Sequence, residues 1–114
     1  MLSRIAESLF WMGRYIERAD GTARLLDVEL QLLLEDPWIE EDQACRSLLE
    51  VIGSASEFPG LMTKQDLLQT ICLDKSDPSS IASAILAARE NARRVREVIS
   101  TELWEGINTT RSRL

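Results

Sequence analysis

The chain has 114 residues, 45% of them hydrophobic, and a formal net charge of -6, a composition that indicates one soluble domain with a core and excludes a disordered tail. The sequence contains no histidine, which excludes catalytic triads, imidazole bases and the Glu-x-x-His ligands of di-iron bundles, and we expect no metal and no cofactor. The acidic charge argues against nucleic acid as a partner, and the lack of an apolar run of ~18 residues or of a signal peptide predicts no membrane contact and a cytoplasmic location.

The first predicted element is a helix of about 30 residues over positions 3–35. Ser3 is a suitable N-cap, and Asp36 followed by Pro37 marks the end of the helix. The apolar positions alternate by four and three residues over four heptads, which is typical of a helix that packs against another helix. These positions are Ile5, Leu9, Met12, Ile16, Ala19, Ala23, Leu26, Leu30 and Leu33.

Two shorter helices are predicted in the middle of the chain. One covers residues 39–53 and ends at Gly53, a residue type that suits the left-handed position after a helix. The other covers residues 63–73 and begins with a capping box formed by Thr63 and Asp66.

The last predicted helix is again long and covers residues 78–106, where the alternation of four and three returns. Asp77 as N-cap and Pro78 in the first turn form its start signal. Together the four helices predict an all-α fold, an antiparallel helical bundle in which the two long helices lie side by side. We expect residues 1–114 to form a single domain.

Glu17 is the centre of an unusual stretch of the first helix. Gly13 and Gly21 lie one turn before and one turn after it, although a glycine inside a helix costs about 0.5–1 kcal/mol relative to alanine. Arg18 follows at once and shares a helix face with apolar residues such as Trp11. We therefore expect the Arg18 guanidinium to stack on an aromatic ring or to be buried against a carboxylate.

Asn91 is similarly placed on the last long helix, among small apolar side chains where a buried amide must find hydrogen bonds. Two accounts fit these polar residues. In one, they form a network that fixes the pairing of the long helices, and the glycines and alanines allow close approach. In the other, the small residues leave a cleft that holds a charged or peptide-like ligand. The candidate residues are Arg14, Glu17, Arg18, Asp20, Arg24, Glu90, Asn91 and Arg94.

Two segments resemble the signatures of the alpha-E family, bacterial helical proteins named for a Glu-Arg motif. The first is residues 1–28, which contain Trp-Met-Gly-Arg-Tyr-Ile-Glu-Arg-Ala-Asp-Gly at 11–21, and the second is residues 89–108, which begin Arg-Glu-Asn-Ala-Arg-Arg-Val. The chain departs from the family pattern at Asp20 and Gly21, where members often carry Glu-Asn. Typical members are longer, so the resemblance implies that this chain corresponds to the N-terminal part of the family's domain.

The resemblance also implies a function in making or modifying peptides, because alpha-E proteins tend to be encoded beside, or fused to, circularly permuted ATP-grasp ligases and transglutaminase-like proteins. We expect a non-catalytic binding or scaffold module with an ATP-grasp-type partner. One alternative is an enzyme or half-site with Glu17 or Glu90 as general base and Arg18 or Arg94 holding an anion. The other is a purely structural bundle.

Because a truncated bundle leaves apolar faces uncovered, we also expect a homo-oligomer. Its predicted interface residues are Trp11, Tyr15, Leu25, Val98 and Trp104.

Overall fold

The structure, a computed structural model, describes residues 2–54 and 58–114. Its elements are α1 (Leu2–Glu35), α2 (Glu41–Val51), α3 (Lys64–Leu68), the π-helical turn η1 (Gln69–Leu73), α4 (Ile81–Arg94) and α5 (Thr101–Arg113). The described residues form helices and no strand, so the predicted all-α fold is confirmed. Within these two ranges, no helix is both long and apolar enough to cross a membrane.

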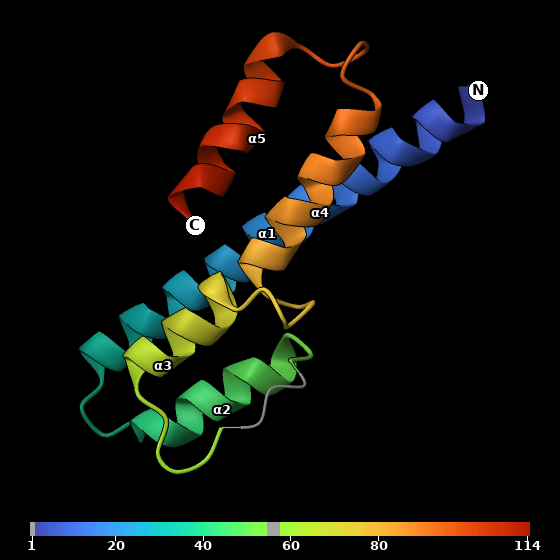
Figure 1. The fold of residues 1–114 in the computed structure, drawn as a ribbon. Helices are drawn as coiled ribbons and strands as arrows, with labels where there is room; N and C mark the ends of the chain where they lie inside the picture. Colours follow the sequence, from blue (N-terminus) through green and yellow to red (C-terminus); the bar gives the residue numbers. More distant parts are fainter. Residues whose placement is uncertain (1, 55–57) are drawn as a thin grey trace.

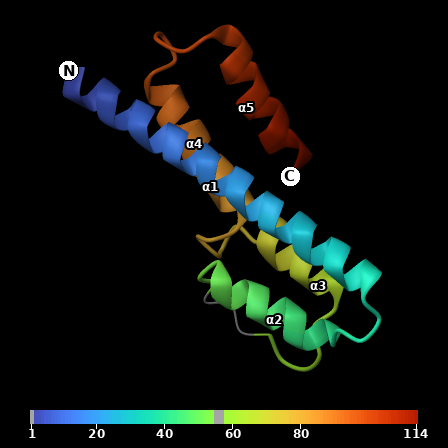
Figure 2. The same cartoon turned by 180° about the vertical axis from the view of Figure 1, so that it is seen from behind.

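The longest helix, α1, runs the length of the molecule (Figure 1). Its 34 residues span about 51 Å at 1.5 Å per residue, and the longest extent of the molecule is 54 Å. Helices α4 and α5 lie beside its N-terminal half, whereas α2 and α3 lie beside its C-terminal half, and the reverse view shows the same arrangement (Figure 2). The molecule therefore has two lobes that share one helix, which we call the α4 lobe and the α2 lobe.

In the α4 lobe, α4 lies antiparallel to α1 and packs against it through alanines. Ala84 clusters with Ala19, whereas Ala88 and Ala92, further along α4, cluster with Met12, nearer the start of α1. Ala88 and Ala92 are completely buried. Because alanine side chains let two helices approach closely, they produce the predicted antiparallel pairing of the first helix with the start of the last one.

The buried face of α1 differs from the predicted one at three residues. Ser8 and Thr22 are buried, whereas Ala23, which we predicted to point inward, is exposed. Both sets of residues alternate by three and four, so the periodicity does not distinguish them. The helix α1 is therefore rotated slightly toward Ser8 and Thr22, which are buried together with Met12 and Ala19.

The predicted single helix over residues 78–106 is interrupted, which corrects the expected second long helix. Residues 95–100 form a turn, with the Val98 N–H donating to the Val95 carbonyl at 2.9 Å, and the chain reverses into α5. β-Branched side chains are frequent in this turn and have lower helix propensity than leucine or alanine. Ser100 then caps α5 by accepting a hydrogen bond from the Leu103 N–H at 3.1 Å.

The α2 lobe has a separate core that contains Met62, Leu67 and Ile71, each at most 1% exposed. Leu26 of α1 reaches the same cluster, so the long helix contributes to both cores. Cys45 of α2 is completely buried there. Desolvation by burial, with smaller contributions from nearby carboxylates, raises the pKa of the Cys45 thiol to about 11. Cys45 therefore remains protonated and packs as a small apolar side chain.

The helix signals predicted in the middle of the chain are confirmed. Thr63 and Asp66 form the expected capping box, in which the Thr63 N–H donates to Asp66 Oδ2 at 3.0 Å and the Asp66 N–H donates to Thr63 Oγ1 at 3.3 Å. Gly53, after α2, has a φ of +78°. That left-handed conformation favours glycine.

Two other predicted N-caps are wrong. The helix α1 already begins at Leu2, so Ser3 lies inside it. Ser80, not Asp77, caps α4. Asp77 instead accepts hydrogen bonds from the Ser79 N–H and hydroxyl within the preceding turn, and another from the Ser54 hydroxyl. Burial alone would raise the pKa of the Asp77 carboxyl, but these hydrogen bonds outweigh it and lower the pKa below its usual value.

Asp42 of α2 forms a hydrogen bond with the segment that leads into α3. Its Oδ1 accepts a hydrogen bond from the Met62 N–H at 2.7 Å and another from Arg46 Nε at 2.9 Å. Arg46 in turn donates to the carbonyl oxygens of Phe58 and Gly60. The Met62 hydrogen bond lowers the pKa of the Asp42 carboxyl, and the neighbouring Arg46 lowers it further, against a partial desolvation that raises it.

We expect Asp42→Asn to destabilise the protein at neutral pH and to flatten its acid unfolding profile. A carboxyl whose pKa is lowered in the folded state contributes stability above its unfolded pKa of about 3.9 and loses that contribution as the pH falls through the folded value. Urea unfolding across the acid range measures this. Asp27→Asn is the control, because Asp27 is exposed and forms no hydrogen bond or ion pair with the described residues. Identical acid profiles for the two variants would contradict the assignment.

Candidate functional site

The Glu-Arg pair lies on an exposed side of α1. Glu17 Oε2 is 3.7 Å from Arg14 Nη1, and the two side chains are 75% and 61% exposed. An exposed pair of this kind stabilises a helix by about 0.3–0.5 kcal/mol. Arg18 is exposed and forms no hydrogen bond, ion pair or ring contact with the residues that the structure describes, so the predicted stacking or burial of its guanidinium is wrong.

A hollow of about 260 Å³ lies over this part of α1, and we call it the Glu-Arg hollow. It is lined by Trp11, Arg14, Tyr15, Glu17 and Arg18. The Trp11 ring contacts the Phe10 ring edge to face at 5.2 Å between centroids and the Tyr15 ring at 5.9 Å. The Trp11 and Tyr15 rings therefore form one wall of the hollow, and the exposed charged groups of Arg14, Glu17 and Arg18 lie around it.

The two glycines beside Glu17 do not serve close packing within the chain. An added Cβ would meet no atom within 4 Å at Gly13 or at Gly21, and both residues are exposed. This corrects the expectation that glycines allow the long helices to approach; the alanines of α4 have that role. The glycines instead leave bare backbone on both sides of the Glu17 side chain.

We expect Gly13→Ala to raise the free energy of unfolding by about 0.5–1 kcal/mol, because alanine fits the open space and favours the helix. Urea unfolding measures the change. Gly53→Ala is the control of opposite sign: its surroundings are equally open, but its φ of +78° strains any residue with a Cβ. Loss of stability in Gly13→Ala would show that a contact absent from this structure covers the position.

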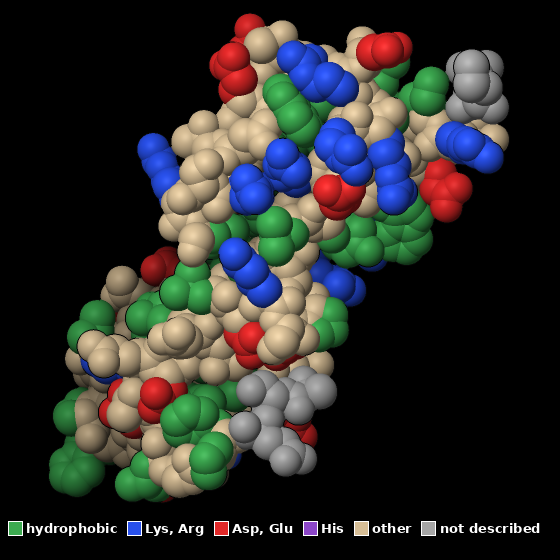
Figure 3. All heavy atoms as spheres, viewed as in Figure 1, with side chains coloured by type: hydrophobic (Ala, Val, Ile, Leu, Met, Phe, Trp, Pro, Cys, Tyr) green, Lys and Arg blue, Asp and Glu red, His purple; other side chains and the backbone are tan. Residues whose placement is uncertain are grey.

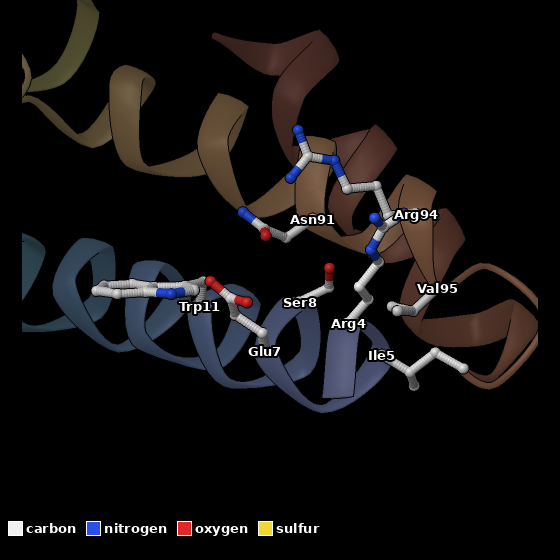
Figure 4. A pocket seen from close by; sticks show the side chains of 8 residues that line it. All are labelled: Arg4, Ile5, Glu7, Ser8, Trp11, Asn91, Arg94 and Val95. Carbon is white, nitrogen blue, oxygen red and sulfur yellow. The ribbon is translucent and has the colours of Figure 1, made fainter. Parts of the chain in front are cut away.

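A larger hollow, of about 510 Å³, lies between the start of α1 and the end of α4 (Figure 4). Its lining residues are Arg4, Ile5, Glu7, Ser8, Trp11, Asn91, Arg94 and Val95. We call it the arginine hollow, because Arg4 enters it from α1 and Arg94 from α4. Trp11 lines both hollows, so they are neighbours along α1.

The arginine hollow replaces the predicted polar network. Asn91 and Arg94 face the first turns of α1 and do not meet Glu17 or Arg18 in a common hollow. The Asn91 side chain is half-buried and donates to the Ala87 carbonyl of its own helix at 2.9 Å. From Ser8, opposite Asn91, to Arg18 is ten residues, or about 15 Å of helix. The register of α1 against α4 produces this separation.

Three residues of the arginine hollow were missed by the sequence analysis: Arg4, Glu7 and Ser8. Arg4, Ser8 and Trp11 follow the helical spacing of four and three, which places them on one face of α1. The spacing shows that the three residues share a face of α1. It does not show that this face lies opposite Asn91, because that depends on the register of α1 against α4.

The other predicted charged residues form short-range pairs on single helices. Arg24 Nε lies 3.0 Å from Asp20 Oδ2, and Arg93 Nη2 lies 2.9 Å from Glu90 Oε2. The Arg93 hydrogen bond and charge lower the pKa of the Glu90 carboxyl. A lowered pKa makes Glu90 a weaker base, which disfavours the predicted general-base role for this residue.

The predicted interface residues differ in exposure. Trp11, Leu25 and Val98 are exposed, at 43%, 45% and 54%, and Tyr15 is half-buried. Trp104 is covered in part, because the guanidiniums of Arg89 and Arg96 lie 5.6 and 5.7 Å from the centroid of its ring. Figure 3 shows Lys and Arg side chains gathered over this half of the molecule. Trp104 therefore anchors a basic surface of the α4 lobe.

The fold and the two hollows define an elongated helical protein whose candidate binding groups lie at its surface, along one long helix. The described residues contain no group of three or more His, Cys, Asp or Glu side chains placed to hold a metal ion. The chain belongs to the Alpha-E family, described as a predicted alpha-helical domain with a conserved ER motif, which it matches over residues 1–114. Glu17 and Arg18 form the one Glu-Arg pair of the sequence, so they are this motif.

Curated relatives are found in mycobacteria. Uncharacterized proteins of Mycobacterium bovis and Mycobacterium tuberculosis (strain CDC 1551 / Oshkosh) are each 25% identical to this chain over 117 residues, which is 89% of this chain and 13% of theirs. A third, from Mycobacterium tuberculosis (strain ATCC 25618 / H37Rv), is 24% identical with the same coverage. The chain thus spans only 13% of the length of the curated relatives it matches. No solved structure matches it.

Proposed function

We propose that this chain is a non-catalytic helical binding module that works in the cytoplasm with an ATP-grasp-type ligase in peptide synthesis or modification. The class of partner is the one that the resemblance to the alpha-E signatures implies, and membership of the Alpha-E family supports that implication. The structure supports a binding role through one exposed face of α1.

The observation that carries the proposal is a second stripe on α1, on a side that α4 does not cover. Trp11, Arg18, Leu25 and Leu32 follow one another at intervals of seven residues, with Val28 between the last two, and all are exposed. We call these five residues the docking stripe. A sustained repeat of seven residues is the pattern by which one helix packs along another. The stripe also passes through the Glu-Arg hollow, so a docked helix would contact the family's motif.

The charged groups of the motif favour binding over catalysis. Glu17 is exposed and paired with Arg14, whereas a general base is usually activated by burial or by a neighbouring carboxylate. Glu90, the other candidate base, has a lowered pKa. Both carboxylates are therefore suited to recognising a cationic group on a partner.

The test is co-purification of the chain with the neighbouring ligase, followed by ATP turnover with and without this protein. We expect Leu25→Asp to abolish co-purification, with a loss of stability of less than about 1 kcal/mol that reflects the lower helix propensity of aspartate. Leu34→Asp is the matched control, since Leu34 is 69% exposed on the opposite side of α1. Retention of the ligase by Leu25→Asp would reject the docking stripe.

Conservative changes in the motif separate binding from catalysis. Glu17→Gln and Arg18→Lys are expected to leave stability unchanged, because both side chains are exposed. In a binding module they weaken the complex but leave the maximal ATP turnover of the saturated ligase intact. A loss of turnover at saturation would instead support a catalytic half-site.

A homo-oligomer is the second candidate, favoured by the same exposed apolar residues of the docking stripe. Light scattering at micromolar concentration measures the mass of the purified chain. A dimer that Leu25→Asp converts to a monomer would support self-association through the stripe. A monomer with the unmodified sequence would contradict it and leave the stripe free for the ligase.

A further inference from the structure

The arginine hollow is lined by two exposed arginines, Arg4 and Arg94, and the charge of Arg94 also helps to lower the pKa of the nearby Glu90 carboxyl. Arg4 reaches it from the first turn of α1 and Arg94 from the last turn of α4, and both line its wall (Figure 4). Neither guanidinium forms a hydrogen bond or ion pair with residues in the described ranges. A guanidinium on each wall of one hollow attracts an anion, and a carboxylate can accept hydrogen bonds from both.

The two ends of this hollow differ in charge. Glu7 also lines it and points toward the side occupied by Trp11, away from the Arg4 end (Figure 4). The Glu7 carboxylate forms no ion pair with the described residues either. Glu7 and the face of an indole ring both attract an ammonium group. The hollow therefore has a cationic end and an anionic, aromatic end.

The middle of the hollow can recognise a peptide group. Ser8 is 8% exposed and Asn91 is half-buried, and both line the wall between the charged ends. The Asn91 amide uses one N–H on the Ala87 carbonyl, which leaves its second N–H and its oxygen for a ligand. A hydroxyl and an amide supply the donors and acceptors that a peptide bond requires.

We propose that the arginine hollow binds the two ends of a short dipolar peptide, with the carboxylate between Arg4 and Arg94 and the ammonium group at Glu7 and Trp11. An extended dipeptide spans about 7 Å, and side chains three residues apart on a helix have Cβ atoms about 5–6 Å apart, so Arg4 and Glu7 can bind opposite ends of one dipeptide. A polyanion such as a nucleotide is disfavoured because Glu7 repels it. This inference does not depend on the ligase partnership.

The probe is the dipeptide Ala-Ala, titrated into the full chain while the indole N–H signal of Trp11 is followed by NMR. Because the charged groups lie at the surface, binding is expected to be weak, with a Kd on the order of 1 mM. N-acetyl-Ala-Ala lacks the ammonium group and Ala-Ala amide lacks the carboxylate, so each is expected to bind about tenfold more weakly. Free alanine and inorganic phosphate complete the series.

Single substitutions assign the two ends. Arg94→Gln is expected to weaken Ala-Ala about tenfold, whereas the matched control Arg93→Gln, next to it and outside the hollow, has no effect. Glu7→Gln is expected to weaken Ala-Ala but not its N-acetyl form, a difference that a general loss of structure would not produce. Unfolding curves identical to that of the unmodified chain show that each variant is folded.

Each outcome decides the proposal. Preference for Ala-Ala over both blocked forms, lost in Arg94→Gln and retained in Arg93→Gln, supports it. The proposal is overturned if no probe produces a saturable shift, or if phosphate or the N-acetyl form binds as tightly as Ala-Ala. Equal binding of free alanine, which has no peptide group and does not reach from Arg4 to Glu7, would also overturn it. None of these results depends on whether the docking stripe binds a ligase.

Discussion

Leu67→Ala is expected to lower the free energy of unfolding by about 2–5 kcal/mol. Leu67 is 0% exposed in the core of the α2 lobe, where it clusters with Met62 and Ile71. Replacing it with alanine removes apolar contacts and leaves a cavity that the surrounding helices fill only in part. The short α3 and η1 are held against α1 and α2 mainly by this cluster, so the loss concentrates in that lobe. Urea unfolding followed by far-UV circular dichroism measures it.

The neighbouring leucine provides the control. Leu68 lies on the same helix but is 36% exposed and outside the buried cluster, so Leu68→Ala is expected to cost less than about 1 kcal/mol. Equal losses in the two variants would show that helix propensity, not core packing, sets the stability of α3. A loss below about 1 kcal/mol for Leu67→Ala would contradict the core described for the α2 lobe.

Ala88→Leu is the second change with a large expected effect, a destabilisation of about 1–3 kcal/mol. Ala88 is 0% exposed between α1 and α4, where it clusters with Met12. A leucine at this contact forces the two helices apart or adopts a strained rotamer. Since leucine and alanine have similar helix propensity, overpacking accounts for the loss. Urea unfolding gives its size.

Ala23→Leu is the matched control, because Ala23 is exposed on α1 and a leucine there meets water. Its unfolding free energy is expected to stay within about 0.5 kcal/mol of the unmodified chain. Ala88→Leu has a further consequence for the arginine hollow, whose walls are α1 and α4. Separation of these helices is expected to weaken Ala-Ala binding in the variant that still folds. A stable Ala88→Leu protein would contradict the close α1 and α4 contact.

Local chemistry made several parts of the fold predictable. The long repeat of apolar residues in α1 and the stop at Asp36 depend only on neighbouring residues, and both were identified. The same is true of the Thr63 capping box and of Gly53. These features are encoded within one or two helical turns, so a single sequence contains the necessary information.

The start and the interruption of the last helix were harder to predict because competing local signals were present. Asp77 and Pro78 form a good start signal, yet Ser80 caps α4 while Asp77 accepts hydrogen bonds in the preceding turn. The apolar repeat continues through the turn at 95–100, and Ile99 packs in the same cluster as Ile107 of α5. A hydrophobic repeat indicates which residues are buried. It does not distinguish a continuous helix from a helical hairpin, because both can bury the same residues.

The sequence by itself determined the helical class, the extent of α1 and the family motif at Glu17 and Arg18, because periodicity, caps and motif letters are properties of the chain. Only the tertiary structure decided which polar residues meet. Arg94 lies in one hollow with Arg4 and away from Glu17. This placement depends on the register at which the alanines of α4 pack against α1. Alternative registers of an alanine-rich helix have similar local energies, so the choice between them is made by the packing of the whole lobe.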